Sequence, residues 1–151
     1  MKKLLAFTCL LVVFACKKEP KPIILPKPVA VEAPVLHECY QGVLGKDTIT
    51  MNLELKGNEV TSGQLRYNFF EKDDNQGELT GLIVGDTLKA AYTFMSEGAA
   101  TVREVAFLKK GKNYLEGYGE VVDDNHGNVS FKDTRTLKFD STHVLKKNNC
   151  Q

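Results

Sequence analysis

The sequence lacks any recognisable catalytic constellation. It contains no tryptophan, only three histidines, and no G-x-S-x-G nucleophile elbow, HExxH pair or Gly-rich phosphate loop. The histidines, His37, His126 and His143, are dispersed along the chain. An enzyme would need His126 or His143 within hydrogen-bonding reach of an acid and a nucleophile in one cleft. We therefore expect a non-catalytic protein without a cofactor or a metal.

An excess of charge of one sign is also missing. The 20 basic and 19 acidic side chains nearly balance, and removing residues 1–15 takes away only Lys2 and Lys3, which leaves one more acid than base. Proteins that bind nucleic acid carry a basic surface, so no nucleic-acid partner is expected. No long apolar run follows residue 15, and a further transmembrane helix is not expected either.

The first sixteen residues have the pattern of an export signal. A basic start, Met1-Lys2-Lys3, precedes an apolar run over 4–15 that is too short for a membrane-spanning helix. The run ends in Val13-Phe14-Ala15-Cys16, which resembles the lipobox of bacterial lipoproteins, and the charged Lys17-Lys18-Glu19 follows directly. The resemblance implies a signal peptide over 1–15 and lipidation at Cys16. The alternative is an ordinary secretory signal with a chance cysteine at its end.

Lipidation would place the protein in the bacterial cell envelope, at the outer membrane, on either its periplasmic or its surface face. The membrane would then be a partner through the N-terminal lipid alone. All five prolines lie between residues 17 and 36, and such density favours an extended chain. We therefore expect a tether over 16–36 and one domain over 37–151.

Two of the four cysteines remain for the domain. Cys9 leaves with the signal and Cys16 carries the lipid, so Cys39 and Cys150 are left at the two ends of the folded region. An isolated pair in an oxidising compartment favours a disulfide. A zinc or redox role would need a CxxC partner or clustered histidines, and neither is adjacent.

From His37 onward apolar and polar residues alternate with a period of two, and glycine with Asn or Asp recurs about every ten residues, which predicts an antiparallel meander. In an eight-stranded up-and-down barrel, strand eight closes on strand one and brings Cys150 to Cys39. We therefore expect an all-β barrel of this kind, with an open β-sandwich as the alternative. The expected strands are 38–44, 47–56, 59–70, 77–85, 87–95, 101–109, 112–122 and 142–149.

The turns of such a barrel fall into two sets by parity. The lysine-rich rim holds the tight turns 56–59, 85–86 and 109–112, and the tether enters there. The long-loop rim holds 71–75, 96–98 and 123–126 and faces away from the membrane, and functional residues usually lie among longer loops. The inward side chains near this rim, which we call the cup residues, are expected to be Tyr67, Phe69, Tyr92, Phe94 and Arg103.

Two interpretations of the cup residues are open. A small aromatic or anionic ligand would fit among four aromatics and one cation. The simpler interpretation, which we favour from the sequence, is that the aromatics are core and that Arg103 pairs with an acid such as Glu97 or Glu116. If the other face of the strand over 101–109 pointed into the barrel, Glu104 would lie inward instead of Arg103.

Two acidic turns suggest calcium at first sight. Residues 73–77 and 123–127 both begin Asp-Asp-Asn and end in glycine. An EF-hand loop needs glycine at its sixth position and Glu at its twelfth, and counting from Glu71 gives Gln76 and Leu82. Because Asp, Asn and Gly also favour β-turns, we expect turns here and no metal.

Several short motifs resemble one protein family. Cys39-Tyr40-Gln41-Gly42-Val43-Leu44 is followed by Asp47-Thr48-Ile49, and later by Gly77-Glu78-Leu79-Thr80-Gly81 and Gly85-Asp86-Thr87-Leu88. These stretches resemble small envelope lipoproteins of Bacteroidetes with a barrel similar to the NlpE amino-terminal domain. The resemblance implies a lipocalin-like barrel and an envelope location over most of 38–150. Gly45-Lys46-Asp47-Thr48 stands where that domain has a CxxC, so its metal and redox roles are not implied.

Two functions follow as hypotheses. The first is a non-catalytic envelope lipoprotein whose long-loop rim contacts an unknown protein or glycan partner. The second is a lipocalin-like carrier of a small hydrophobic or anionic ligand in the cup. A lined opening of several hundred cubic ångströms beneath the long-loop rim favours the carrier, whereas a filled interior removes it.

Overall fold

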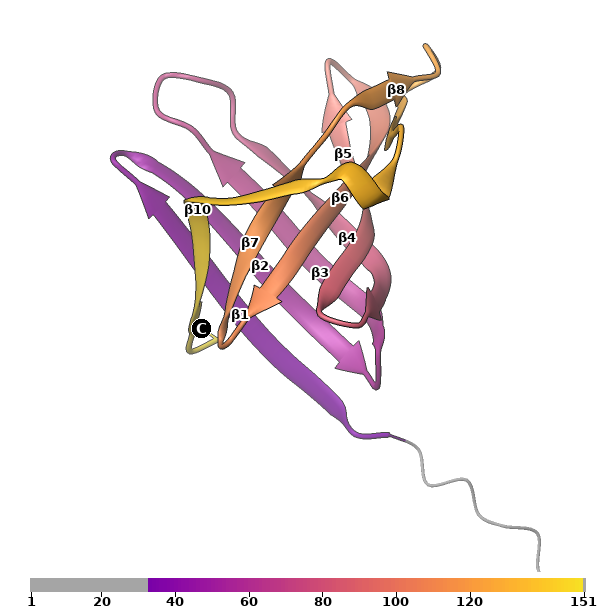
Figure 1. Ribbon diagram of the computed structural model, residues 1–151. Helices are drawn as coiled ribbons and strands as arrows, with labels where there is room; N and C mark the ends of the chain where they lie inside the picture. Colours follow the sequence, from indigo (N-terminus) through magenta and orange to yellow (C-terminus); the bar gives the residue numbers. More distant parts are fainter. Residues whose placement is uncertain (1–32, 151) are drawn as a thin grey trace, which may run out of the picture. The chain divides into compact units, whose positions relative to one another are not determined.

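Residues 33–150, which the computed structural model describes, contain ten strands and one short 3-10 helix (Figure 1). The expected signal peptide over 1–15, the lipidation site Cys16 and the tether as far as residue 32 lie outside the described residues. The first strand begins at Val35, three residues earlier than the sequence predicts. No helix in the described part of the chain is long and apolar enough to cross a membrane.

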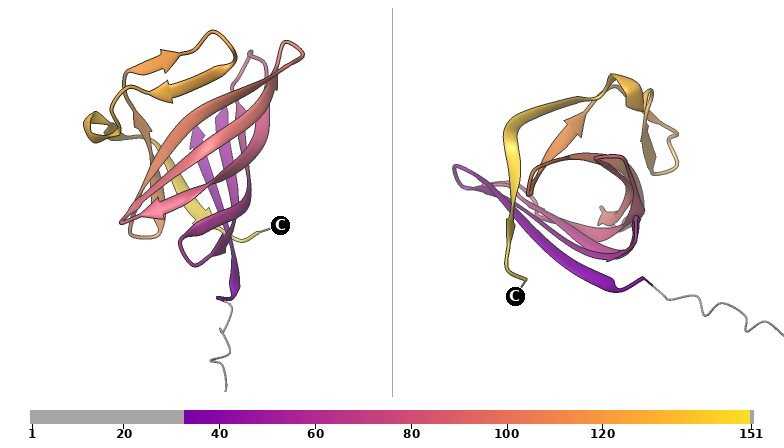
Figure 2. Two further views of the ribbon diagram at one scale, coloured as in Figure 1. Left: turned by 90° about the vertical axis from the view of Figure 1, so that its right-hand side faces the viewer. Right: turned by 60° about the horizontal axis from the view of Figure 1, so that its bottom comes forward.

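Eight of the strands pair in a closed antiparallel ring, which confirms the predicted barrel over the open sandwich (Figure 2). Strands β1 to β7 pair in chain order, the last strand β10 pairs with both β7 and β1, and β10 thereby closes the ring. The ring strands are β1 (Val35–Leu44), β2 (Asp47–Lys56), β3 (Glu59–Asn68), β4 (Asn75–Val84), β5 (Thr87–Ser96), β6 (Ala99–Lys110), β7 (Asn113–Tyr118) and β10 (Lys138–Asn148).

The alternation of apolar residues places one face of each strand inside the ring. On β2 the inward residues Ile49, Met51, Leu53 and Leu55 are all buried, and similar rows on the other strands complete one hydrophobic core. Glycine occupies the first position of the tight turns after β2 and β4. Gly57 and Gly85 have φ of 63° and 61° there, a conformation that glycine adopts without a steric penalty. Val35 pairs with Lys56, so the described chain starts at the lysine-rich rim.

The chain leaves the ring after β7 and returns through an excursion that the sequence did not predict. This segment holds β8 (Val121–Asp123), β9 (Asn128–Phe131) and the 3-10 helix η1 (Thr134–Thr136). The sequence predicted one strand over 112–122, which ends at Tyr118 in the structure, and no element between 123 and 141. Two glycines admit the returning chain. A Cβ added to Gly117 would lie 2.6 Å from the Phe139 ring, and one added to Gly119 would lie 2.7 Å from Leu137.

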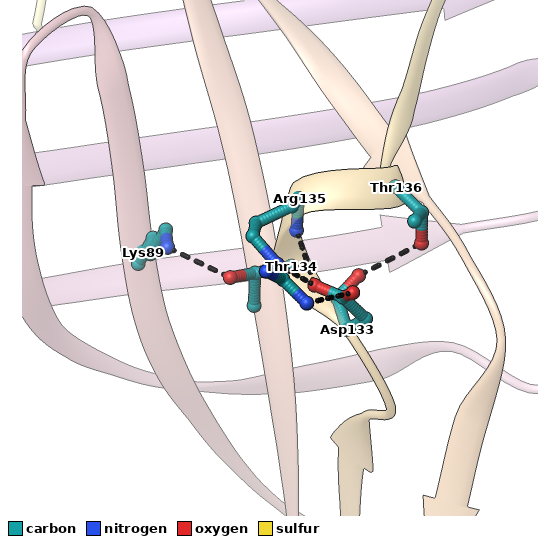
Figure 3. Close-up of polar contacts among 5 residues, drawn as sticks. All are labelled: Lys89, Asp133, Thr134, Arg135 and Thr136. Atoms are coloured by element: carbon teal, nitrogen blue, oxygen red, sulfur yellow. Dashed lines mark hydrogen bonds and ion pairs between the residues drawn. The ribbon is translucent and has the colours of Figure 1, made fainter.

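The excursion is fixed to the outer wall of the barrel. Strand β9 pairs in parallel with the rim end of β6, and the Phe131 amide donates to Glu104 Oε2 at 2.9 Å. Asp133 caps η1 by accepting from the Arg135 amide, and Lys89 Nζ on β5 donates to Thr134 Oγ1 at 2.9 Å (Figure 3). Glu104 therefore faces outward, toward the excursion.

A covalent bond and an ionic cluster hold the seam between β1 and β10. Cys39 and Cys150 form the predicted disulfide. Beside it, the partly buried carboxylate of Glu38 accepts from Tyr40 Oη and Lys147 Nζ, both at 2.6 Å, and lies 3.5 Å from Lys109 Nζ. Burial acts to raise the pKa of Glu38, but the hydrogen bonds from Lys147 and Tyr40 and the two lysine charges hold this pKa below its ordinary value.

Candidate functional site

The structure brings the five cup residues together at the long-loop rim. They line one opening of about 270 Å³, which also includes side chains that the sequence did not assign to the cup. Tyr67 comes from β3 and Phe69 from just beyond it, Tyr92 and Phe94 come from β5, and Arg103 comes from β6. The additional lining residues are Ile49, Asn75, Glu116, Tyr118 and His143.

The four aromatic rings form a continuous wall. Tyr92 stacks on Phe94 with the ring centroids 4.7 Å apart, and it meets Tyr67 edge-on at 5.8 Å. Tyr67 in turn lies 5.8 Å from Phe69. Such arrangements are favourable for ring quadrupoles, and they leave aromatic surface toward the opening. Tyr92 is buried, whereas Tyr67, Phe69 and Phe94 are partly exposed.

Glu116 contributes a carboxylate to the floor of the cup. It is only 9% exposed, and its oxygens accept from Tyr67 Oη at 2.6 Å and from Tyr118 Oη at 3.0 Å. Tyr118 Oη also lies 3.2 Å from His143 Nδ1. Burial, followed by the charge of Glu116 and the hydrogen bond to it, raises the pKa of Tyr67 well above its ordinary value, so this phenol stays a donor.

The sequence considered Glu116 only as a partner for Arg103. Alternation along β7 places Tyr114, Glu116 and Tyr118 on one face, and Tyr114 belongs to the core. That alternation was the signal that could have placed the carboxylate inside the barrel.

The hydroxyl of Tyr92 is a buried polar group without a partner. The residue is 2% exposed, and its Oη forms no hydrogen bond with any side chain or backbone group that the structure describes. Burial raises the pKa of Tyr92 to about 12, with a smaller contribution from Asp74. A buried hydroxyl that lacks a partner costs about 1–3 kcal/mol, and native proteins retain few of them. Tyr92 lines the cup, but its hydroxyl has almost no surface open to it.

Arg103 faces the cup, as the chosen strand phase predicts. It lies opposite Tyr92 in the β5–β6 register, while its neighbour Glu104 points outward to the excursion. The side chain is exposed at the mouth, and it forms no ion pair with Glu97, Glu116 or any other side chain described for residues 33–150. The mouth thus carries a cation that is available to solvent or to a ligand.

The two acidic turns use their carboxylates for local structure. Asp124 accepts from the amides of His126 and Asn128, and Asp74 binds the guanidinium of Arg66. Within residues 33–150 no three His, Cys, Asp or Glu side chains gather in a way that would hold a metal ion.

A larger hollow lies elsewhere on the barrel but offers weaker chemistry. Its volume is about 760 Å³, and it lies where β7 ends and the excursion begins. Most of its charged side chains are already engaged, because Lys132 pairs with Glu120 and Asp133 pairs with Arg135. The cup, with its aromatic wall, its buried Glu116 and the exposed Arg103, is the better candidate.

Fold and cup together define a small antiparallel barrel that is filled toward one end and has a lined opening at the other. Comparisons of the chain with protein-family models, with curated proteins and with solved structures found no match. The resemblance to NlpE-like lipoproteins therefore stays a prediction from short motifs.

Proposed function

We propose that this protein is a non-catalytic, lipid-anchored envelope protein whose barrel binds one small molecule in the cup. The observation that carries the proposal is an opening of about 270 Å³ that is lined by four aromatic side chains, the carboxylate-bearing Glu116 and Arg103. This volume is slightly below the usual range of about 300–1,000 Å³ for pockets of drug-sized ligands, so the occupant is small.

The distribution of the core supports a carrier over a purely structural barrel. Apolar side chains such as Leu53, Leu55 and Phe107 fill the interior toward the lysine-rich rim. At the opposite end the aromatic rings line an opening and do not close it. In addition, the non-glycine residues with positive φ in the described chain, Glu71, Glu97 and Asn125, lie in loops of the long-loop rim. Such conformations often occur at binding sites.

Native mass spectrometry of the whole protein, purified from its own envelope, tests this function. We expect one retained small molecule per chain. Asn75→Trp places a large ring in the cup and should abolish retention. Gln76→Trp, the matched control, adds the same ring to the exposed neighbouring position on β4 and should leave retention intact. Retention unaffected by Asn75→Trp, or no retained molecule in the unchanged protein, would leave a protein or glycan partner as the better function.

The membrane anchor has its own test. Cys16→Ala should eliminate incorporation of labelled fatty acid, because only the lipoprotein pathway acylates a cysteine at this position. Globomycin should likewise cause the precursor of the unchanged protein to accumulate. Fatty-acid labelling of the Cys16→Ala variant at the level of the unchanged protein would contradict lipidation at Cys16 and favour an ordinary secretory signal.

A further inference from the structure

The interior of the cup holds a buried carboxylate, and its mouth carries a cation. Glu116 is buried on the floor, and none of the Lys, Arg or His side chains described for residues 33–150 forms an ion pair with it. The hydroxyls of Tyr67 and Tyr118 solvate the carboxylate but bring no positive charge. A buried charge without an opposite charge is costly, whereas the charge of the exposed Arg103 is screened by water. A positive group on a ligand would therefore be favoured inside.

The aromatic wall adds a second preference for a cation. Positive groups within about 6 Å of a ring centroid are attracted to the ring face, and the attraction grows when water is excluded. Tyr67, Phe69, Tyr92 and Phe94 provide four adjoining rings beside the carboxylate. An aromatic wall and a carboxylate acting on the same small volume are suited to an organic ammonium ion.

The carboxylate of Glu116 distinguishes among ammonium ions. A primary ammonium group has three N–H donors, and the Glu116 carboxylate has acceptor sites beyond the two that Tyr67 and Tyr118 use. A quaternary ammonium has no N–H group and could not donate to this carboxylate. The arrangement therefore matches N–H donors as well as positive charge.

We propose that the cup binds a small primary ammonium compound, with its charged nitrogen at the Glu116 carboxylate and its apolar body along the aromatic wall. This inference rests on the proposed function, because it names the chemistry of the molecule held in the cup. An anionic ligand, which Arg103 alone suggests, is disfavoured because its charge would face Glu116. Arg103 at the mouth instead suits a carboxylate at the outer end of the same molecule.

Three probes of nearly equal size separate charge from hydrophobicity. They are phenethylamine, 2-phenylethanol and 3-phenylpropanoate, which place a cation, a neutral group and an anion on the same aromatic body. Calorimetric titration of the whole protein in mild detergent, against a detergent blank, should show at least tenfold tighter binding of the amine than of either other probe. Equal or tighter binding of the alcohol or the anion would overturn the proposal.

Two matched variants test whether Glu116 causes the preference for the amine over the alcohol. Glu116→Gln keeps the shape of the side chain and an acceptor for Tyr67 but removes the charge, so the advantage of the amine over the alcohol should fall to less than threefold. Glu78→Gln removes the same charge from the exposed outer face of β4 and should preserve that advantage. Continued binding of the alcohol by Glu116→Gln shows that the cup is intact. An amine preference that survives this substitution would also overturn the proposal.

A further pair of probes examines the mouth. Phenylalanine adds a carboxylate to the phenethylamine framework, so Arg103→Gln should weaken phenylalanine binding relative to phenethylamine binding. The outcomes separate the two levels of inference. Binding of the alcohol or the anion without a preference for the amine rejects the ammonium ligand but retains a small-molecule site. Absence of binding by every probe, together with no molecule retained from the envelope, rejects both.

Discussion

Replacing Cys39 and Cys150 together by serine is expected to lower the free energy of unfolding by about 4–5 kcal/mol, because the bond closes a loop of roughly one hundred residues in the unfolded chain. The two cysteines are 111 positions apart in the sequence. A loss of this size is a large fraction of the stability of an ordinary domain, which is about 5–15 kcal/mol. Urea denaturation of the whole protein, followed by circular dichroism, measures it.

The location of the bond adds to the expected effect. Strands β1 and β10 are in register over only three residue pairs, Cys39 with Asn148 to Gln41 with Lys146, whereas β1 and β2 pair along their whole length. The disulfide thus reinforces the shortest seam of the ring. Chemical reduction of the unchanged protein is the control and should reproduce the loss. A change below about 1 kcal/mol in both experiments would mean that the disulfide constrains the unfolded chain little.

Alkaline pH is expected to unfold the protein steeply. Burial raises the pKa of Tyr92 and Tyr114 to about 12, and it also raises the pKa of Tyr40 and Tyr67, which are further raised by Glu38 and Glu116 respectively. In the unfolded chain these phenols lose their protons near pH 10. The folded state then holds more protons than the unfolded state, so stability is fully present below about pH 10 and is lost as the pH rises toward the folded pKa values.

The size of the effect follows from the number of phenols. Each one that stays protonated only in the folded state costs about 1.4 kcal/mol per pH unit, so four cost about 5 kcal/mol per unit. Tyrosinate absorbance should rise in one cooperative step that coincides with loss of the strand signal in circular dichroism. The absence of tryptophan simplifies this measurement.

Tyr114→Phe provides a matched test of the alkaline transition. The Tyr114 hydroxyl is buried without a hydrogen-bond partner in the described chain, so its removal leaves no acceptor or donor unsatisfied. The variant should unfold at a higher pH and with a shallower dependence on pH. Gradual ionisation of the five tyrosines near pH 10 with the fold retained would contradict the prediction.

The barrel could be predicted because its strands are long and their alternation is regular. Ile49 to Leu55 and Leu88 to Phe94 each set a face over four positions, and the pair of cysteines indicated closure. The β8–β9 excursion could not be predicted in this way. Its strands have three and four residues, too few for a period, and its position depends on contacts of Gly117 and Gly119 with a later segment. A local sequence pattern carries no information about such contacts between segments that are far apart in the chain.

The candidate site could likewise be predicted only in part from the sequence. Alternation placed Tyr67, Tyr92 and Arg103 at one rim, and the structure brings them together. The same alternation could have placed Glu116 inside the barrel. An inward charge contradicts the usual expectation that acids face water, however, so Glu116 was considered only as a partner for a cation. The proposed ligand chemistry depends on that one residue, so the sequence alone left a hydrophobic or an anionic ligand open, and the ammonium proposal could arise only from the position of Glu116 in the structure.

The disulfide also decides how the molecule would carry mechanical load. A pull between the two chain ends passes from Cys39 directly to Cys150, because the covalent bond is a shorter path than the 111 positions between them. Only the residues before Cys39 and those after Cys150 lie on that path. Once the first residues of β1 have been peeled from β2, the rest of the barrel bears no tension. The bond therefore acts as a mechanical bypass, and shear on the chain ends would leave the cup undeformed.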